Sequence, residues 1–150
     1  MLLYKIINPI VKALLASPVH GLMSDNTVVL YTRGRKTGRA YSTPVSYMQE
    51  SKVLHCFTAR TSPWWRNVAA MAKIEVLLQG QRRTATPAVI LDDDARKNEV
   101  LTRFLRAVPR DAAFSGVTML SSGEPDGDDI ARVVSNMVLV ELHLSEDSSE

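Results

Sequence analysis

The sequence predicts one small α+β domain built around a closed or split antiparallel β-barrel of about six strands with flanking helices. The chain has 150 residues, 45% hydrophobic and 23% charged, an ordinary mixture for one globular domain. Short apolar, β-branched segments follow one another through tight turns. The helical segments fall between hairpins instead of alternating with strands, which argues against a doubly wound parallel sheet. We find no internal repeat or linker and expect a single domain over residues 1–150.

The first expected element is an apolar helix over about residues 2–17. Its aliphatic residues recur at helical spacing, with a kink or restart near Pro9. The run without charge or proline is well below the roughly 20 residues that span a bilayer. No basic start or cleavage site indicates a signal peptide. We expect the helix to pack on the core, with the alternative that it touches a membrane or covers the site.

The strands are expected where apolar and β-branched residues gather between turn signals. A glycine-containing turn over residues 34–38 joins the first two, and residues 49–51 form the next turn. Pro44 indicates that its strand lies at an edge or a bulge. The expected strands are residues 27–32, 41–48, 53–58, 74–78, a long strand ending near 91, and 138–144.

Capping signals place the remaining helices. Ser62 as N-cap and Pro63 at the first helical position predict a helix that carries both tryptophans. Residues 92–94 are expected to cap a helix with an apolar stripe between residues 100 and 108.

The C-terminal third is expected to be less regular. Residues 109–124 read as irregular, and Asp126 or Asp128 as the cap of a short helix. Residues 145–150 read as a disordered acidic tail.

Cysteine content and charge exclude several classes of site. The lone Cys56 rules out an intrachain disulfide and any zinc site built on several thiolates, and it fits a cytoplasmic location. The formal net charge of +2 is too small to indicate a nucleic-acid partner. Basic residues are nevertheless concentrated around residues 33–39, which favours a local site for an anion.

That basic turn is the first candidate site. Gly34 and Gly38 let the backbone fold closely. The planar guanidinium groups of Arg35 and Arg39 and the compact ammonium charge of Lys36 both suit a phosphate or carboxylate. The turn matches neither a Walker loop nor a dinucleotide fingerprint. From the residues alone, anion binding and a solvated surface turn remain equally open.

The second candidate lies at residues 58–67, where a strand ends and a helix begins. The free N–H groups of a helix start can bind an anionic or carbonyl oxygen. Because Trp64 and Trp65 are adjacent, they face different ways on a helix, and one of them is free to lie against a planar ring. The alternative is that both serve the core or an interface.

The other chemically active residue types carry weaker signals. We expect His55 to be a hydrogen-bonded core residue and Cys56 to be a small buried hydrophobe. No G-x-S-x-G sequence supports a serine nucleophile, and the three histidines lack the spacing of metal ligands. We therefore expect no metal site and assign no catalytic side chain.

Two sequence stretches resemble the deazaflavin (coenzyme F-420)-dependent nitroreductase or quinone reductase family. One is T-R-G-R-K-T-G-R-A-Y-S-T-P-V at residues 32–45, and the other is S-P-W-W-R-N-V-A at residues 62–69. The order of strands around them and the C-terminal E-P-D-G-D-D-I-A-R-V-V-S-N-M-V-L-V-E-L are also similar, so the resemblance covers nearly the whole chain. It implies an FMN-binding split-barrel-like fold with a cofactor groove.

The resemblance also implies a set of cofactor-binding residues. The basic turn would hold the phosphate and acidic tail of coenzyme F-420, the segment after the third strand would line the deazaflavin ring, and the tryptophan helix would support it. The residues implied are Arg35, Lys36, Thr37, Arg39, Thr43, Pro44, Thr58, Ala59, Arg60, Trp64, Trp65 and Asn67.

The function implied is hydride transfer between a reduced deazaflavin and a small planar acceptor such as a quinone or nitroaromatic. The alternatives are an oxidoreductase that uses FMN and a non-catalytic protein that binds a flavin or lipid. The chain departs from the family in a short loop before the tryptophans and in having no tyrosine after Tyr47, so a C-terminal tyrosine cannot donate a proton. We further expect a homodimer, no nucleic acid, and a cytoplasmic protein with at most peripheral contact to the inner face of the membrane.

Overall fold

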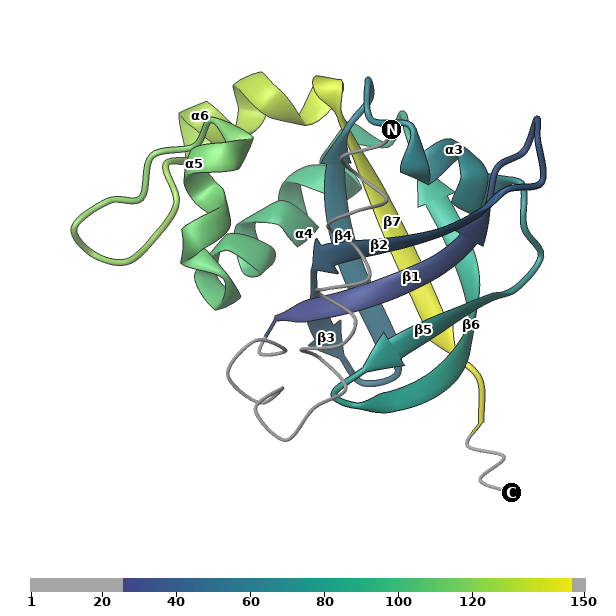
Figure 1. Ribbon diagram of the computed structural model, residues 1–150. Coiled ribbons are helices and arrows are strands. Elements are labelled where there is room, and N and C mark those ends of the chain that lie inside the picture. Colours follow the sequence, from purple (N-terminus) through teal and green to yellow (C-terminus); the bar gives the residue numbers. More distant parts are fainter. Residues whose placement is uncertain (1–25, 147–150) are drawn as a thin grey trace.

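The computed structural model describes residues 26–146, in which seven antiparallel strands form one strongly curled sheet (Figure 1). The order across the sheet is β2-β1-β5-β6-β7-β4-β3. The strands are β1 Thr27–Arg33, β2 Ala40–Ser46, β3 Met48–Glu50, β4 Val53–Ala59, β5 Ile74–Leu78, β6 Gln81–Ile90 and β7 Met137–Leu144. The predicted split antiparallel barrel is therefore confirmed, with seven strands in place of about six.

The curl follows from the two edge strands, β2 and β3. They lie at opposite ends of the sheet order, yet only Tyr47 separates them in the chain. The Tyr47 N–H donates to the Asn26 carbonyl at 2.9 Å, which holds the bend against the start of β1. Because the two edges are joined by a single residue, the sheet must close on itself at this corner.

This corner corrects two predictions. Residues 41–48 do not form one strand, and Gln49 and Glu50 belong to β3 instead of a turn, which lies at Ser51 and Lys52. The sequence has no glycine or proline at the bend, so it carried no signal of a break. Pro44 does lie in an edge strand, as predicted, where its missing N–H interrupts no second ladder.

Strand β7 runs through the middle of the sheet and is buried on both faces. It pairs with β6 on one side and β4 on the other. Every residue of β7 is buried except His143. Val138, Val140 and Leu142 face the barrel interior, and Leu139 faces a second core beneath the helices. The strand therefore joins the two hydrophobic cores of the molecule.

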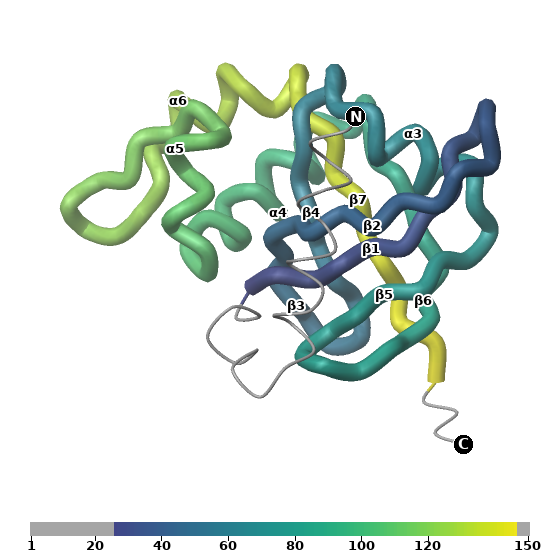
Figure 2. Tube along the Cα trace, viewed as in Figure 1, coloured from purple at the N-terminus to yellow at the C-terminus, as the bar shows by residue number. Residues whose placement is uncertain are grey.

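The helices lie in two places (Figure 1). α3 packs beside the β1–β2 hairpin, and the other helices gather at the opposite side of the sheet over the second core. In Figure 2 the chain can be followed from the end of β4 into α3 and back to β5. The helices are α3 Trp64–Ala69, α4 Asp94–Ala107, α5 Ala112–Ser115 and α6 Gly127–Val133, with 3-10 turns η1 Pro109–Asp111 and η2 Val134–Asn136.

Two of the predicted caps are confirmed and one is wrong. The Asp93 carboxylate accepts from the Arg96 N–H at the start of α4, and Asp126 accepts from two N–H groups at the start of α6. Ser62 does not cap α3, whose N-cap position is Pro63 with no side-chain hydrogen bond. The segment expected to be irregular contains η1 and α5.

Some expectations lie wholly or partly outside the described residues. The predicted helix over residues 2–17 and the last residues of the acidic tail, 147–150, belong there. At the start of that tail, the Ser145 N–H donates to the Thr84 carbonyl, and Glu146 pairs with Lys52 at 2.8 Å. Between residues 26 and 146, no helix combines the length and apolar character needed to cross a bilayer.

Candidate cofactor site

The tip of the β1–β2 hairpin is a tight turn built on two glycines. The Gly34 N–H donates to the Arg39 carbonyl at 2.7 Å, and the Gly38 N–H donates to the Gly34 carbonyl at 2.8 Å. Gly38 has a φ of +74°, which favours glycine. A Cβ on Gly34 would lie 3.0 Å from Thr37 Oγ1 and 3.2 Å from the Tyr41 ring. The glycine therefore lets the turn fold down onto that ring.

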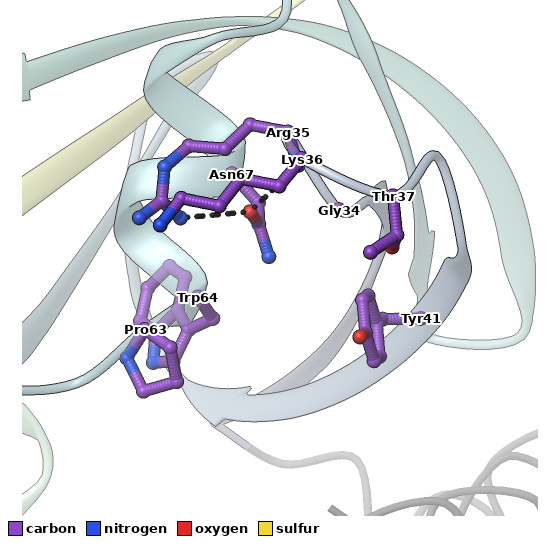
Figure 3. A pocket seen from close by; sticks show the side chains of 8 residues that line it. All are labelled: Gly34, Arg35, Lys36, Thr37, Tyr41, Pro63, Trp64 and Asn67. Carbon is purple, nitrogen blue, oxygen red and sulfur yellow. Dashed lines mark hydrogen bonds between the residues drawn. The ribbon is translucent and has the colours of Figure 1, made fainter.

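Asn67 of α3 fixes the turn from the other side. Its amide oxygen accepts from the Arg35 backbone N–H at 3.2 Å and from Arg35 Nη1 at 3.3 Å, as the dashed lines of Figure 3 show. The Asn67 side chain is only 9% exposed, so this contact is held within the structure. Two segments 32 residues apart are thereby locked into one site.

Between the turn and α3 lies a cavity of about 230 Å³. In Figure 3, Thr37 and Tyr41 lie on one side of it and the Pro63 and Trp64 rings on the other, with Arg35 and Lys36 beside them. Among residues 26–146, no carboxylate lines it. The residues that line it are Gly34, Arg35, Lys36, Thr37, Tyr41, Pro63, Trp64 and Asn67.

The structure thus brings five of the predicted site residues together: Arg35, Lys36, Thr37, Trp64 and Asn67. Tyr41 and Pro63 were not predicted as site residues, although both lie within the two sequence stretches that pointed to the site. The signal for Tyr41 was its place in the returning strand opposite Thr32, which sets it beneath the turn.

Three predicted residues on the hairpin lie away from this cavity lining. The Arg39 N–H donates to Thr37 Oγ1 at 3.2 Å, and Arg39 is exposed. Thr43 is buried in β2, and its hydroxyl has no hydrogen-bond partner among the described residues. Pro44 follows it, opposite Val29.

The predicted residues at the end of β4 take other positions. Thr58 and Ala59 line a second cavity, of about 520 Å³, on the side of the helices. The Arg60 guanidinium donates to the carbonyls of Ser135 at 2.8 Å and Leu91 at 2.6 Å, and to Asp92 at 2.9 Å. Its side chain therefore ties the loops beside β4 together and contributes no lining to either cavity.

The two tryptophans take different positions, and only one of them lines the first cavity. Trp65 is buried, and its indole N–H donates to the Arg60 carbonyl at 3.0 Å, while the Arg66 guanidinium lies 4.5 Å from its ring centroid. Trp64 is also part of the main core but lines the first cavity. Only Trp64 is placed to contact a ligand held by the basic turn.

The two cavities lie on either side of one turn. The Ser62 N–H donates to the Ala59 carbonyl at 3.0 Å, so the Cα atoms of these residues are within about 7 Å. Ala59 lines the second cavity, and Pro63, directly after the turn, lines the first. Figure 1 shows the end of β4 between α3 on one side and α5 and α6 on the other.

The weaker chemical candidates belong to the core, as predicted. The His55 side chain is 5% exposed, with Nε2 3.0 Å from Glu50 and Nδ1 3.2 Å from Glu141. Burial lowers the pKa of His55, against the opposing effect of Glu141 and Glu50, and raises the pKa of the Cys56 thiol. Within residues 26–146 no group of acidic, histidine or cysteine side chains is arranged to hold a metal ion.

The donor set suits a ligand with a negative end and a flat ring. Arg35 and Lys36 supply cationic donors, Thr37 supplies a hydroxyl, and no carboxylate of the described part of the chain lines the cavity beside them. The Trp64 and Tyr41 rings and Pro63 provide apolar walls beside these donors. The residues present therefore fit a phosphate-bearing flavin or deazaflavin.

Solved structures confirm the fold at low sequence identity. An FMN-binding protein related to pyridoxamine 5'-phosphate oxidase from Nostoc punctiforme PCC 73102 gives a TM-score of 0.55 at 16% identity, covering 91% of this chain and 79% of that one. The heme storage protein HutZ from Vibrio cholerae gives 0.56 at 11% identity, covering 93% and 91%. General Stress Protein 26 from Bacillus anthracis str. Sterne gives 0.51 at 19% identity, covering 81% of each chain.

Among curated proteins, none matches the sequence. A protein family does match it, over residues 4–118, which include both the basic turn and the tryptophan helix. This family consists of oxidoreductases that depend on a deazaflavin and act on a small molecule. The match spans most of the chain and agrees with the split-barrel fold: the protein belongs to the F420H2-dependent quinone reductase family.

Proposed function

We propose that this protein reduces a small planar acceptor, a quinone or a nitroaromatic, with coenzyme F-420, and that the first cavity holds the anionic end of that cofactor. The observation that carries the proposal is the convergence of Arg35, Lys36, Thr37 and Trp64 on one cavity that no carboxylate lines within the described range. The family match supports the cofactor and the class of acceptor.

Each lining residue has a defined part in this proposal. Asn67 accepts two hydrogen bonds from Arg35 and so presents the guanidinium in one orientation. Lys36 adds a mobile point charge, and the Thr37 hydroxyl adds a further hydrogen bond. When bound, a reduced deazaflavin supplies the hydride, while the chain binds, orients and shields it.

The proposal keeps two of the predicted cofactor contacts, Thr58 and Ala59, because of where they lie. Thr58 and Ala59 lie across the Ala59–Ser62 turn from Pro63, so a ring that leaves the first cavity over this turn would meet their backbone. Arg60 acts indirectly, because its guanidinium anchors the segment that carries them.

FMN is the second candidate cofactor. The same cationic turn suits its phosphate, and the fold is shared with an FMN-binding protein. Titration of the purified protein with coenzyme F-420, FMN and heme, followed by absorbance and fluorescence, separates the cofactors. Addition of menadione to the protein with reduced cofactor then separates a reductase from a carrier that binds without turnover.

The double variant Arg35→Ala, Lys36→Ala tests the phosphate site. Each charge-assisted hydrogen bond contributes about 1.5–3 kcal/mol, so we expect the affinity for coenzyme F-420 to fall about 100-fold or more. The matched control is Lys52→Ala, Arg106→Ala, which removes two exposed cations that lie in surface ion pairs. Unchanged affinity in the first double variant, or an equal loss in the control, would remove the assignment.

A further inference from the structure

The second cavity, of about 520 Å³, has the size and walls of a small-molecule site. Phe57 of β4 forms one wall, and its ring is held edge-on by Phe104 at a centroid distance of 5.5 Å. Phe114 of α5 lies at the rim with 92% of its surface exposed, an unusual position for a large apolar side chain. A flat aromatic molecule would cover both rings.

Of the residues that the structure describes, one with a carboxyl group lines this cavity, Asp111 at the end of η1. The Ser46 hydroxyl of β2 donates to Asp111 Oδ1 at 3.2 Å. Among the described residues no group donates to Oδ2, and the Asp111 side chain is 21% exposed. Partial burial raises the pKa of Asp111, and this exceeds the opposing effects of Ser46 and Arg110.

Of the two basic groups around Asp111, one forms a long ion pair with it and the other is paired elsewhere. Arg110, its neighbour in the chain, holds Nε 3.8 Å from Oδ1. Arg132 of α6 lines the same cavity but pairs with Asp129 at 2.8 Å. On β4, burial raises the pKa of the Cys56 thiol, and the charge of the Asp111 carboxylate adds to that rise. Asp111 is thus the lining group that can hold and release a proton.

We propose that this cavity binds the acceptor, a flat aromatic compound with a carbonyl oxygen, and that Asp111 donates a proton to that oxygen. The inference rests on the proposed function. Reduction of a quinone to a hydroquinone needs two electrons and two protons. The acceptor gains two electrons and one proton as hydride from the reduced deazaflavin. It gains the second proton from Asp111, which regains one from solvent.

The position of the cavity supports this role. Ala59 lines it, and the Ala59–Ser62 turn separates it from the first cavity by a single β-turn. An acceptor beside Thr58 and Ala59 would therefore lie next to the segment proposed to line the deazaflavin ring. The sequence has no tyrosine after Tyr47, so no phenol from the C-terminal part of the chain can supply this proton.

The first test measures binding of menadione to the cofactor-free full chain by calorimetry between pH 4 and 8. We expect wild-type affinity to fall about 2- to 10-fold as the Asp111 carboxyl ionises, the effect of losing one hydrogen bond. Asp111→Asn keeps a donor at all pH values, so its affinity should be independent of pH and match the low-pH wild type. Phe114→Ala, at an exposed site, should weaken binding about 2- to 10-fold.

The second test separates binding from proton donation. With reduced coenzyme F-420, Asp111→Asn should lower kcat about 100-fold or more at little cost in KM, because an amide cannot give up a proton. Ser46→Ala removes the bond that stabilises the carboxylate, so the fall of kcat/KM with rising pH should move to higher pH. The control Asp128→Asn, at an exposed carboxyl of α6, should change nothing.

The outcomes distinguish this inference from the proposed function. Wild-type protein that binds coenzyme F-420 but not menadione overturns the inference alone. So does an Asp111→Asn variant with wild-type kcat and wild-type dependence of menadione affinity on pH. Protein that binds menadione with the predicted dependence on Asp111 but has no affinity for coenzyme F-420 overturns the proposed function and supports the cavity.

Discussion

At the residue scale, the candidate site depends on one buried amide. The Asn67 amide is uncharged, so it orients the Arg35 guanidinium without neutralising its charge. Its amide oxygen accepts both hydrogen bonds from Arg35. A carboxylate at the same place would form an ion pair and cancel part of the positive potential that attracts an anion. The residue type at position 67 therefore decides whether the turn stays available to a ligand.

The substitution Asn67→Asp tests this point. We expect about a 10-fold or greater loss of affinity for coenzyme F-420, because the new carboxylate lies within 3.3 Å of the Arg35 donors and opposes the phosphate. Fluorescence titration measures the change. Asn98→Asp on α4 adds the same charge away from the cavity and should leave the affinity unaltered. Equal affinity of Asn67→Asp and wild type would contradict the role given to this amide.

At the scale of elements, α4 is attached to the sheet by a fully buried lysine. Lys97 Nζ donates to the carbonyls of Leu91 at 2.6 Å and Met137 at 3.0 Å, and lies 3.1 Å from Asp94. It thus joins the end of β6, the start of β7 and the first turn of α4. Because these elements support the helices around the second cavity, this contact positions the cavity walls.

The substitution Lys97→Met should destabilise the protein by about 3 kcal/mol. It preserves most of the side-chain volume but removes the charged donor shared by the Leu91 and Met137 carbonyls and the cation beside Asp94, leaving Leu91 with Arg60 and Asp94 with Ser135. Urea denaturation followed by tryptophan fluorescence measures the free energy of unfolding. Lys52→Met, which breaks an exposed ion pair, should change it by less than about 1 kcal/mol. A loss no larger than that of the control would show that Lys97 is not needed for the fold.

At the scale of the whole molecule, a ligand that binds only the folded barrel must stabilise it. Coenzyme F-420 at 100 times its Kd should raise the free energy of unfolding by about 2.7 kcal/mol, and Tm by about 5–10 °C. Differential scanning fluorimetry measures the shift, and FMN and heme at equal concentration rank the cofactors. The Arg35→Ala, Lys36→Ala variant at the same ligand concentration should show little shift. An equal shift in that variant would place the cofactor elsewhere.

Assembly and membrane contact remain predictions at this scale. A homodimer is expected, and size-exclusion chromatography with light scattering tests it. A peripheral membrane contact through residues 2–17 is the alternative to packing of that helix on the core, and it concerns a part of the chain that the structure does not describe. No nucleic-acid partner is expected, since the net charge is +2.

The sequence by itself determined the strand-rich domain, the basic turn, the tryptophan helix and the family. These depend on local signals: glycines that permit a tight turn, aspartates that cap helices, and alternation of apolar residues along strands. The burial of His55 and Cys56 was also predictable, because both lie within an apolar strand.

Only the tertiary structure decided which of the predicted residues share a cavity. In the fold Asn67 contacts Arg35, 32 residues away in the chain, and the Arg60 guanidinium binds the Ser135 and Leu91 carbonyls instead of lining the cavity. The chain bends at Tyr47, where the barrel closes. The tertiary structure also set Asp111 and Phe114, which carry no motif, beside the end of β4. These are contacts between distant segments, and they depend on how the sheet curls, which no local pattern specifies.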